Sequence, residues 1–240
     1  MERALKRLGQ VTVVAPAIEQ SGVGHSITYL APLMASEAFD GERKRGWAVE
    51  GSPADCVKLA IGQFCPAKPD LIVSGINGGF NIGVNILYSG TVAGATEGAL
   101  FGIPSVAVSL EWDERPKFDR AAALATTLIE QIVAQQDARQ ELLYNINIPT
   151  VALERAAEVR VVPMATARWP ADFEERRDPK GRRYYWATGT PPVTPTGQTT
   201  DLEAIAQGYV TLTPLRIDRT EQQRLETLRG WNFSLPMVVK

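Results

Sequence analysis

The sequence predicts an α/β protein with a Rossmann-like, mostly parallel sheet flanked by helices and a β-rich C-terminal arm. Short, continuously apolar runs that are typical of buried strands occur at residues 11–15, 70–74 and 105–109. Helical stretches alternate with these runs, which is the order expected of strand–helix–strand units. From about Val159 the chain changes to short strand-like pieces separated by Pro, Gly and Thr. We therefore expect a core over residues 1–150 and a β-rich oligomerisation arm over residues 151–240.

The first two helices are predicted from apolar spacing and from capping residues. Residues 1–8 carry apolar side chains at helical spacing, and Gly9 follows the last turn. A later helix begins at Ser52, which suits the N-cap, with Pro53 at the first helical position and Asp55 at the third. We interpret Asp55 first as a capping residue, with a metal ligand as the alternative.

The rest of the core is predicted from the same kind of pattern. A helix begins near Thr91, a long amphipathic helix covers residues 118–135, and a strand over residues 142–149 ends at a proline. In the arm, strand-like pieces occur at residues 160–163, 183–187 and 209–215. The aromatic run at 184–186 is typical of a subunit interface, although such residues can equally pack on their own core.

Composition excludes several classes of protein. The 240 residues are 45% hydrophobic, which is typical of a globular domain, and 25 basic against 27 acidic residues give a net charge of -2. This balance argues against a polymeric nucleic acid or an anionic membrane as partner and favours a small molecule or another protein. No apolar run reaches the roughly 18 residues of a membrane span, and Met1 does not open a signal peptide, so we expect a cytoplasmic protein. Cys56, Cys65 and a single histidine form neither a disulfide framework nor a zinc site, so any metal would be held by oxygen.

Three clusters of glycine and polar residues follow predicted strands, where an open α/β sheet forms its ligand crevice. They lie at residues 20–26, 74–81 and 88–91. Glycines let the main chain approach an anion, and the helix that begins near Thr91 presents unpaired N–H groups at its first turn. The clusters therefore favour phosphate binding, although each of them alone could simply turn the chain or cap a helix.

Other nucleotide and hydrolase motifs do not match. The pair Gly22 and Gly24 lacks the third glycine of a dinucleotide fingerprint, and no Gly-Lys-Ser or Gly-Lys-Thr of a P-loop occurs. No serine lies in a Gly-x-Ser-x-Gly elbow, which argues against a serine hydrolase. His25 is the single histidine, and beside Gly24 it fits an orienting hydrogen-bond group better than a general acid or base.

Several ordered motifs extend over almost the whole chain. They are the segments 13–16, 21–26, 51–59, 74–77, 88–92, 97–98, 144–149, 178–181, 184–186, 200–202, 208–210 and 213–215, together with Asn81 and Gly83. In sequence and order they closely resemble the SurE family of survival-protein 5'/3'-nucleotidases.

This resemblance implies a metal-dependent phosphomonoesterase that hydrolyses nucleoside 5'- and 3'-monophosphates to nucleoside and phosphate. It implies a divalent metal, Mg²⁺ or Mn²⁺, and a homodimer or homotetramer built through the C-terminal arm. By motif, the expected metal ligands are Ser21 and Asn77. The expected phosphate-binding residues are Ser89, Gly90, Thr91, Gly22 and Gly78, and the residues with a possible orienting role are His25 and Asn81.

The chain departs from the family at its N-terminal end. The family carries adjacent aspartates in an Asn-Asp-Asp-Gly motif after its first strand, and no such pair precedes Val11. Two neutral oxygens hold a hard dication poorly, because such ions favour carboxylates. One hypothesis is a start codon assigned too far downstream; the alternative is an inactive truncated homologue that acts as a noncatalytic phosphate-binding or scaffold protein. In either case a missing core strand would expose apolar surface, so we expect poor solubility. A smaller departure is Asn85, where the family usually carries aspartate.

Overall fold

The computed structural model describes residues 1–135, 142–167, 171–188 and 199–235. Its central sheet has the strand order β4-β5-β6-β10-β7. The strands are β4 (Ile72–Gly78), β5 (Ser105–Leu110), β6 (Leu143–Ile148), β7 (Val159–Val161) and β10 (Val210–Leu215). β4, β5 and β6 run parallel, β10 is antiparallel to β6, and β7 is parallel to β10. The predicted α/β class with a mostly parallel sheet is therefore confirmed, and the region 151–240 adds two strands to that sheet.

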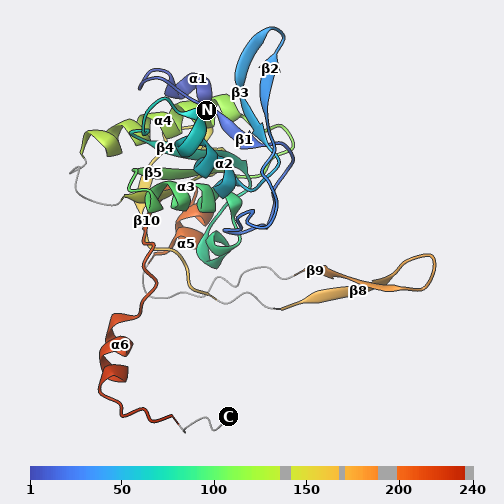
Figure 1. The fold of residues 1–240 in the computed structure, drawn as a ribbon, viewed down its shortest axis with the longest axis vertical. Coiled ribbons are helices and arrows are strands. Elements are labelled where there is room, and N and C mark those ends of the chain that lie inside the picture. The colour runs from blue at the N-terminus through green and yellow to red at the C-terminus, as the bar shows by residue number, and fades with distance from the viewer. Residues whose placement is uncertain (136–141, 168–170, 189–198, 236–240) are drawn as a thin grey trace.

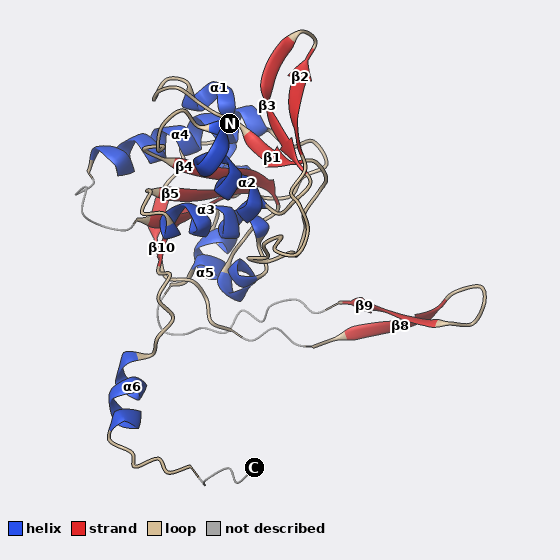
Figure 2. Ribbon diagram, viewed as in Figure 1, coloured by secondary structure: helices blue, strands red, loops and turns tan. Residues whose placement is uncertain are grey.

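Helices cover both faces of the central sheet (Figure 2). α4 (Phe118–Ala134) packs apolar side chains, Ile129 among them, against the face of β5 that carries Val106 and Val108. α3 (Gly90–Leu100) packs Val92 and Ala95 against the intervening residue, Ala107. Because successive side chains of a strand point to opposite faces, the two helices lie on opposite sides of β5.

α2 (Pro53–Leu59) begins as the sequence predicts and is followed by the π-helix η1 (Ala60–Phe64). Ser52 accepts a hydrogen bond from the Asp55 amide, and the Asp55 carboxylate accepts one from the Ser52 amide. The same carboxylate also accepts bonds from the amide and the hydroxyl of Thr28. Burial alone would raise the pKa of Asp55, but these hydrogen bonds outweigh it and lower the pKa. Asp55 is therefore a buried capping residue, as the first of the two interpretations predicted.

A smaller sheet holds β1 (Val14–Pro16), β2 (Ala35–Asp40) and β3 (Arg43–Val49) in the order β1-β3-β2. β1 is parallel to β3, whereas β2 and β3 form an antiparallel hairpin that extends away from the core (Figure 1). β1 occupies only the last part of the apolar run predicted over residues 11–15.

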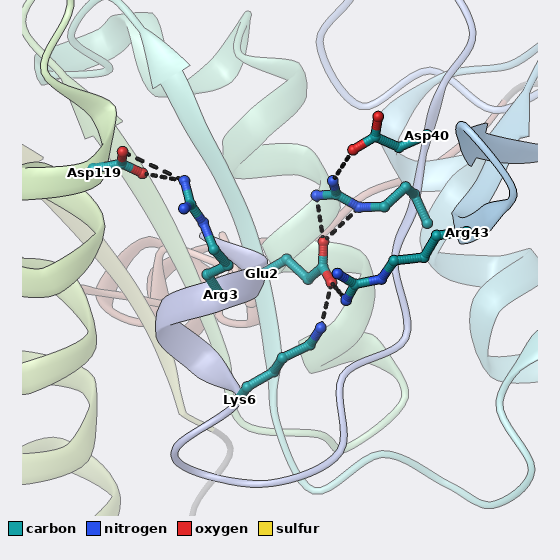
Figure 3. A network of polar contacts seen from close by, with 7 residues as sticks. Glu2, Arg3, Lys6, Asp40, Arg43 and Asp119 are labelled. Carbon is teal, nitrogen blue, oxygen red and sulfur yellow. Dashed lines mark hydrogen bonds and ion pairs between the residues drawn. The ribbon is translucent and has the colours of Figure 1, made fainter.

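The first helix, α1 (Glu2–Leu5), is shorter than the predicted span of residues 1–8. A helix of one turn has little stability of its own, and ion pairs attach this one to both parts of the fold. Glu2 lies 2.7 Å from the ammonium of Lys6 and 2.6 Å from the guanidinium of Arg45 on β3, and Arg3 lies 3.1 Å from Asp119 on α4 (Figure 3). Hydrogen bonds from Lys6 and Arg45 lower the pKa of Glu2 to about 2. α1 therefore links the smaller sheet to the helix layer of the larger one.

Two elements extend from the core on the side of the C-terminus (Figure 1). They are the hairpin of β8 (Phe173–Arg177) with β9 (Arg183–Ala187), and α6 (Gln222–Arg229). Tyr184, Tyr185 and Trp186 on β9 are between 40% and 56% exposed, so the chain itself does not cover them. An oligomer built through this hairpin stays a prediction. Within the described ranges, the structure contains no helix with the length and apolar character that a membrane crossing requires.

Gly98 lies on α3 in close contact with side chains of the central sheet. An added Cβ would be 2.4 Å from the Ser105 hydroxyl and 2.6 Å from Cδ1 of Ile72. Helix propensity favours Gly98→Ala by roughly 1 kcal/mol at most, but overpacking a core costs roughly 1–3 kcal/mol. We therefore expect Gly98→Ala to lower the free energy of unfolding in urea by about 1 kcal/mol.

The matched control is Gly62→Ala in η1, where an added Cβ would meet nothing within 4 Å. We expect this control to leave the free energy of unfolding unchanged or slightly higher. A gain in stability for Gly98→Ala would mean that α3 can move off the sheet without loss of packing.

Candidate functional site

The predicted metal- and phosphate-binding residues all line one cavity of about 1400 Å³. From the loop after β1 come Ser21 and Gly22, from β4 come Asn77 and Gly78, and from the start of α3 come Ser89, Gly90 and Thr91. The structure thus brings together residues from three segments at the carboxyl edge of the sheet, where open α/β folds bind ligands.

The first turn of α3 forms the part of this site that is best suited to an anion. Ser89 is the N-cap and accepts a hydrogen bond of 3.1 Å from the Val92 amide. Gly90 and Thr91 begin the helix, where backbone N–H groups have no partner within the helix and the dipole places partial positive charge. A phosphate group fits such a helix start.

The segment after β1 that holds the cluster at residues 20–26, here called the glycine loop, packs directly on the start of α3. The Gly24 amide donates a hydrogen bond of 2.9 Å to the carbonyl of Tyr88. Gly24 has a φ of +59°, and an added Cβ would lie 3.2 Å from the carbonyl oxygen of Leu87. An added Cβ on Gly90 would lie 3.3 Å from the carbonyl oxygen of Gln20. Glycine at both positions therefore permits this close approach of loop and helix.

The two predicted metal ligands are placed differently. Ser21 is exposed, and its hydroxyl donates a hydrogen bond of 2.6 Å to the carboxylate of Glu19. Asn77 is half-buried on β4, and its amide group donates a bond of 2.8 Å to the carbonyl of Gly79. Both residues carry a side-chain oxygen and line the cavity, and Glu19, which also lines it, is a carboxylate that sequence reasoning did not select.

These oxygens do not complete a site for a divalent cation. In the part of the chain that the structure describes, no group of three or more His, Cys, Asp or Glu residues lies close enough to hold a metal. Mg²⁺ and Mn²⁺ favour carboxylates, and one exposed glutamate beside two neutral donors offsets little of the cost of removing the ion's water. The residues described do not fit such a metal on their own.

The cavity continues from the site into the space between the two sheets. There it is lined by residues 11–16 around β1 and by residues 71–78 around β4, with α1 and α2 contributing further side chains. Among the described strands, β1 is bonded only to β3 and β4 only to β5. Each of these two strands therefore has one edge without a strand partner, and the residues of both line the same cavity.

Asn81, predicted as an orienting residue, belongs to a buried amide network. Its backbone amide donates to Oδ1 of Asn147 at 2.8 Å, and its carbonyl accepts from the side-chain amides of Asn145 and Asn147. The Asn81 side chain donates to the Ser109 hydroxyl at 2.7 Å. These bonds fix the loop after β4 against β5 and β6. Asn145 and Asn147 lie within a motif of the sequence, but sequence reasoning gave them no role.

His25, the other predicted orienting residue, contacts a buried carboxylate. Its Nε2 lies 2.7 Å from Glu97 on α3, and the second oxygen of Glu97 lies 3.1 Å from the ammonium of Lys58 on α2. Glu97 is only 4% exposed. Glu97 belongs to one of the motifs in the sequence, but the sequence did not predict its contacts with His25 and Lys58.

Cys56, which lines the cavity, is not suited to nucleophilic chemistry. Cys56 is buried and Cys65 half-buried, and both are free. Burial raises the pKa of the Cys56 thiol to about 12, and the charge of Asp55 adds to this effect. Cys56 therefore stays protonated near neutral pH, where a thiol is a weak nucleophile.

Comparisons with known proteins agree with one another. The family described as survival protein SurE matches residues 1–171. A Rhodopirellula baltica protein named 5'-nucleotidase SurE is 50% identical over 234 residues, which cover 97% of this chain and 92% of the relative. A protein of the same name from Syntrophobacter fumaroxidans is 39% identical, with 93% and 89% covered. The crystal structure of the SurE protein from Aquifex aeolicus matches with a TM-score of 0.80 and 35% identity over 95% of this chain and 91% of that one.

Proposed function

Because the chain belongs to the SurE family, we propose that it is a phosphomonoesterase that hydrolyses nucleoside 5'-monophosphates, and 3'-monophosphates as well. In this reaction water adds to phosphorus and the bond from phosphorus to the ribose oxygen breaks. That oxygen leaves with a proton, so the products are a nucleoside and inorganic phosphate. The observation that carries the proposal is the start of α3, where Ser89, Gly90 and Thr91 face the same cavity as Ser21 and Asn77.

The chain's own residues would bind and orient the phosphate group. Amides at the first turn of α3 and the hydroxyls of Ser89 and Thr91 can donate hydrogen bonds to its non-bridging oxygens. Donors that are fixed before the reaction stabilise charge that develops in the transition state. The glycine loop that packs on this helix start, with Gly22 at a φ of +71°, gives the main chain close access to the same group.

We further propose that the negative charge required by Mg²⁺ or Mn²⁺ comes from an additional strand seated between β1 and β4. This proposal is supported by the unpartnered edges of both strands and by the cavity that they line. Such a strand would be buried on both faces and therefore continuously apolar. Run parallel to β4, it would end beside Asn77, so carboxylates directly after it would lie next to Asn77 and Ser21.

A noncatalytic phosphate-binding protein is the second candidate function. The specific observation in its favour is that the described residues offer an anion site at α3 but no complete site for a dication. Such a protein would bind phosphate or a nucleotide without releasing product.

Phosphate release from a panel of nucleoside monophosphates distinguishes these functions. The chain is assayed with Mg²⁺ or Mn²⁺, alone and with a synthetic peptide of five apolar β-branched residues followed by two aspartates. The control peptide carries two asparagines in place of the aspartates. We expect metal-dependent release only with the aspartate peptide.

Each of the other outcomes has a distinct meaning. Metal-dependent release by the chain alone would show that its own carboxylates, Glu19 first among them, hold the ion, and the additional strand would be refuted. Equal release with both peptides would refute the role of the carboxylates. If calorimetry detects phosphate binding and no condition gives release, the noncatalytic function is favoured.

A further inference from the structure

We infer that Glu97 is a positioning residue that acts through His25 to hold the glycine loop against the phosphate-binding start of α3. The inference rests on the proposed function, because it assigns to the loop a part in ligand binding. It begins from a buried charge: Glu97 is 4% exposed, and a buried carboxylate persists in folded proteins only when it is paired and hydrogen-bonded.

The two oxygens of Glu97 have different partners. Oε1 lies 3.1 Å from the ammonium of Lys58, and Oε2 lies 2.7 Å from Nε2 of His25. The Lys58 side chain is 44% exposed and extends from the neighbouring helix α2, so it offsets the charge of the carboxylate. The His25 side chain is 30% exposed and belongs to the loop, so its contact with Glu97 joins the loop to α3.

Glu97 stands on the same face of α3 as the phosphate-binding turn. It follows Gly90 by about two helical turns, which returns a side chain to nearly the same direction. The loop runs along this face: Gln20 and Val23 pack on Gly90, and His25 reaches Glu97. One helix therefore carries both the anion site at its start and the anchor of the loop that packs over that site.

The neighbouring loop contacts show why this anchor matters to Ser21 and Gly22. C-terminal to His25, the loop is held firmly, because the carbonyl of Ser26 accepts a bond of 2.6 Å from the Ser52 hydroxyl. On the N-terminal side, Ser21 is exposed and bonds to Glu19 within the loop itself. Among the described residues, the His25–Glu97 contact and the Gly24–Tyr88 bond are thus the first polar attachments to the core on the C-terminal side of Ser21 and Gly22.

The test combines amide hydrogen exchange of residues 18–28, followed by mass spectrometry, with calorimetric binding of inorganic phosphate and of AMP. The variants are His25→Ala, Glu97→Gln and Lys58→Met. For His25→Ala we expect exchange in the loop to rise about tenfold, the change that follows from losing about 1.4 kcal/mol of a hydrogen bond to a charged group. We expect the Kd for both ligands to rise by a similar factor.

The other two variants separate positioning from general stability. Glu97→Gln keeps a side chain that can hydrogen-bond His25, so we expect it to retain slow loop exchange and most of the affinity. Lys58→Met removes the charge partner and leaves the His25 contact, so we expect lower thermal stability with loop exchange close to that of the unmodified chain.

The inference is overturned if His25→Ala leaves loop exchange unchanged, or if it speeds exchange while both Kd values stay the same. It is also overturned if Lys58→Met accelerates loop exchange as much as His25→Ala does, because the cluster would then serve stability alone. Failure of the proposed function has a different signature: the unmodified chain binds neither phosphate nor AMP, whereas the loop-exchange comparison still reports whether Glu97 anchors the loop.

Discussion

Replacement of Asp201 by alanine is expected to cost about 3 kcal/mol of unfolding free energy, because three backbone donors lose their acceptor at roughly 1 kcal/mol each. The carboxylate of Asp201 is fully buried and accepts hydrogen bonds from the amides of Gly83, Ala165 and Leu202 at 2.8 to 2.9 Å. It thereby fastens the start of α5 (Asp201–Ala206) to η2 (Gly83–Leu87), the short helix that precedes α3 in the chain. Urea denaturation measures the change.

The ionisation of Asp201 works in the opposite direction. Burial raises the pKa of Asp201, although the backbone hydrogen bonds counteract part of the rise. The folded state therefore holds this proton more tightly than the unfolded state, and ionisation costs stability as the pH rises above the unfolded value through the folded one. Alanine removes this cost but leaves the buried amides of Gly83 and Ala165 and the half-buried amide of Leu202 without this acceptor.

Two further variants serve as comparisons for Asp201→Ala. Asp201→Asn keeps one acceptor oxygen and should fall between Asp201→Ala and the unmodified chain. Asp172→Ala removes an exposed aspartate near the hairpin and should change the free energy of unfolding by less than about 0.5 kcal/mol. An Asp201→Ala protein as stable as Asp172→Ala would show that the three amides find other partners.

Asn147→Ala is the second substitution for which we expect a large loss, about 2–3 kcal/mol. Asn147 is fully buried on β6; its oxygen accepts from the Asn81 amide, and its nitrogen donates to the Asn81 carbonyl. Alanine leaves the amide without this acceptor and creates a small cavity. Because Asn81 fixes the loop between β4 and η2, we also expect weaker binding of phosphate, measured by calorimetry.

An exposed asparagine provides the control for Asn147. Asn232→Ala should leave both the unfolding midpoint in urea and the affinity for phosphate unchanged, because the residue is exposed and distant in sequence from the site. Loss of stability in Asn147→Ala with unchanged phosphate affinity would separate the buried network from the binding site and contradict the second half of the prediction.

The sequence was most informative where local chemistry decides the structure. The apolar run at 105–109 became β5, whose residues are all buried, and the Ser52–Asp55 pattern became a capping box. β2 and β8 were not predicted, because nearly all their residues are exposed and show no alternation of apolar and polar side chains. These strands form by pairing with β3 and β9, and such pairing is not visible in a short stretch of sequence.

In the candidate site, too, features with a local sequence signature could be predicted, whereas contacts between distant residues could not. The glycine and hydroxyl cluster at residues 88–91 predicted the start of α3, because helix starts have local signatures, and phosphate binding there stays a prediction. Glu97 looks like an ordinary helical residue, since its partner His25 is 72 positions away. The roles of Asn147 and Asp201 likewise come from tertiary contacts with loops that are distant in sequence.

The position of the β8–β9 hairpin between two neighbouring strands makes it an internal insertion rather than a terminal appendage. The chain leaves the sheet at β7 and returns to it at β10, and these strands pair in parallel, Val159 opposite Val210. The hairpin can therefore lengthen, shorten or change sequence without altering the register of the sheet. α6 follows the last strand of the central sheet. The surface of the hairpin and the architecture of the central sheet are thus free to evolve at different rates.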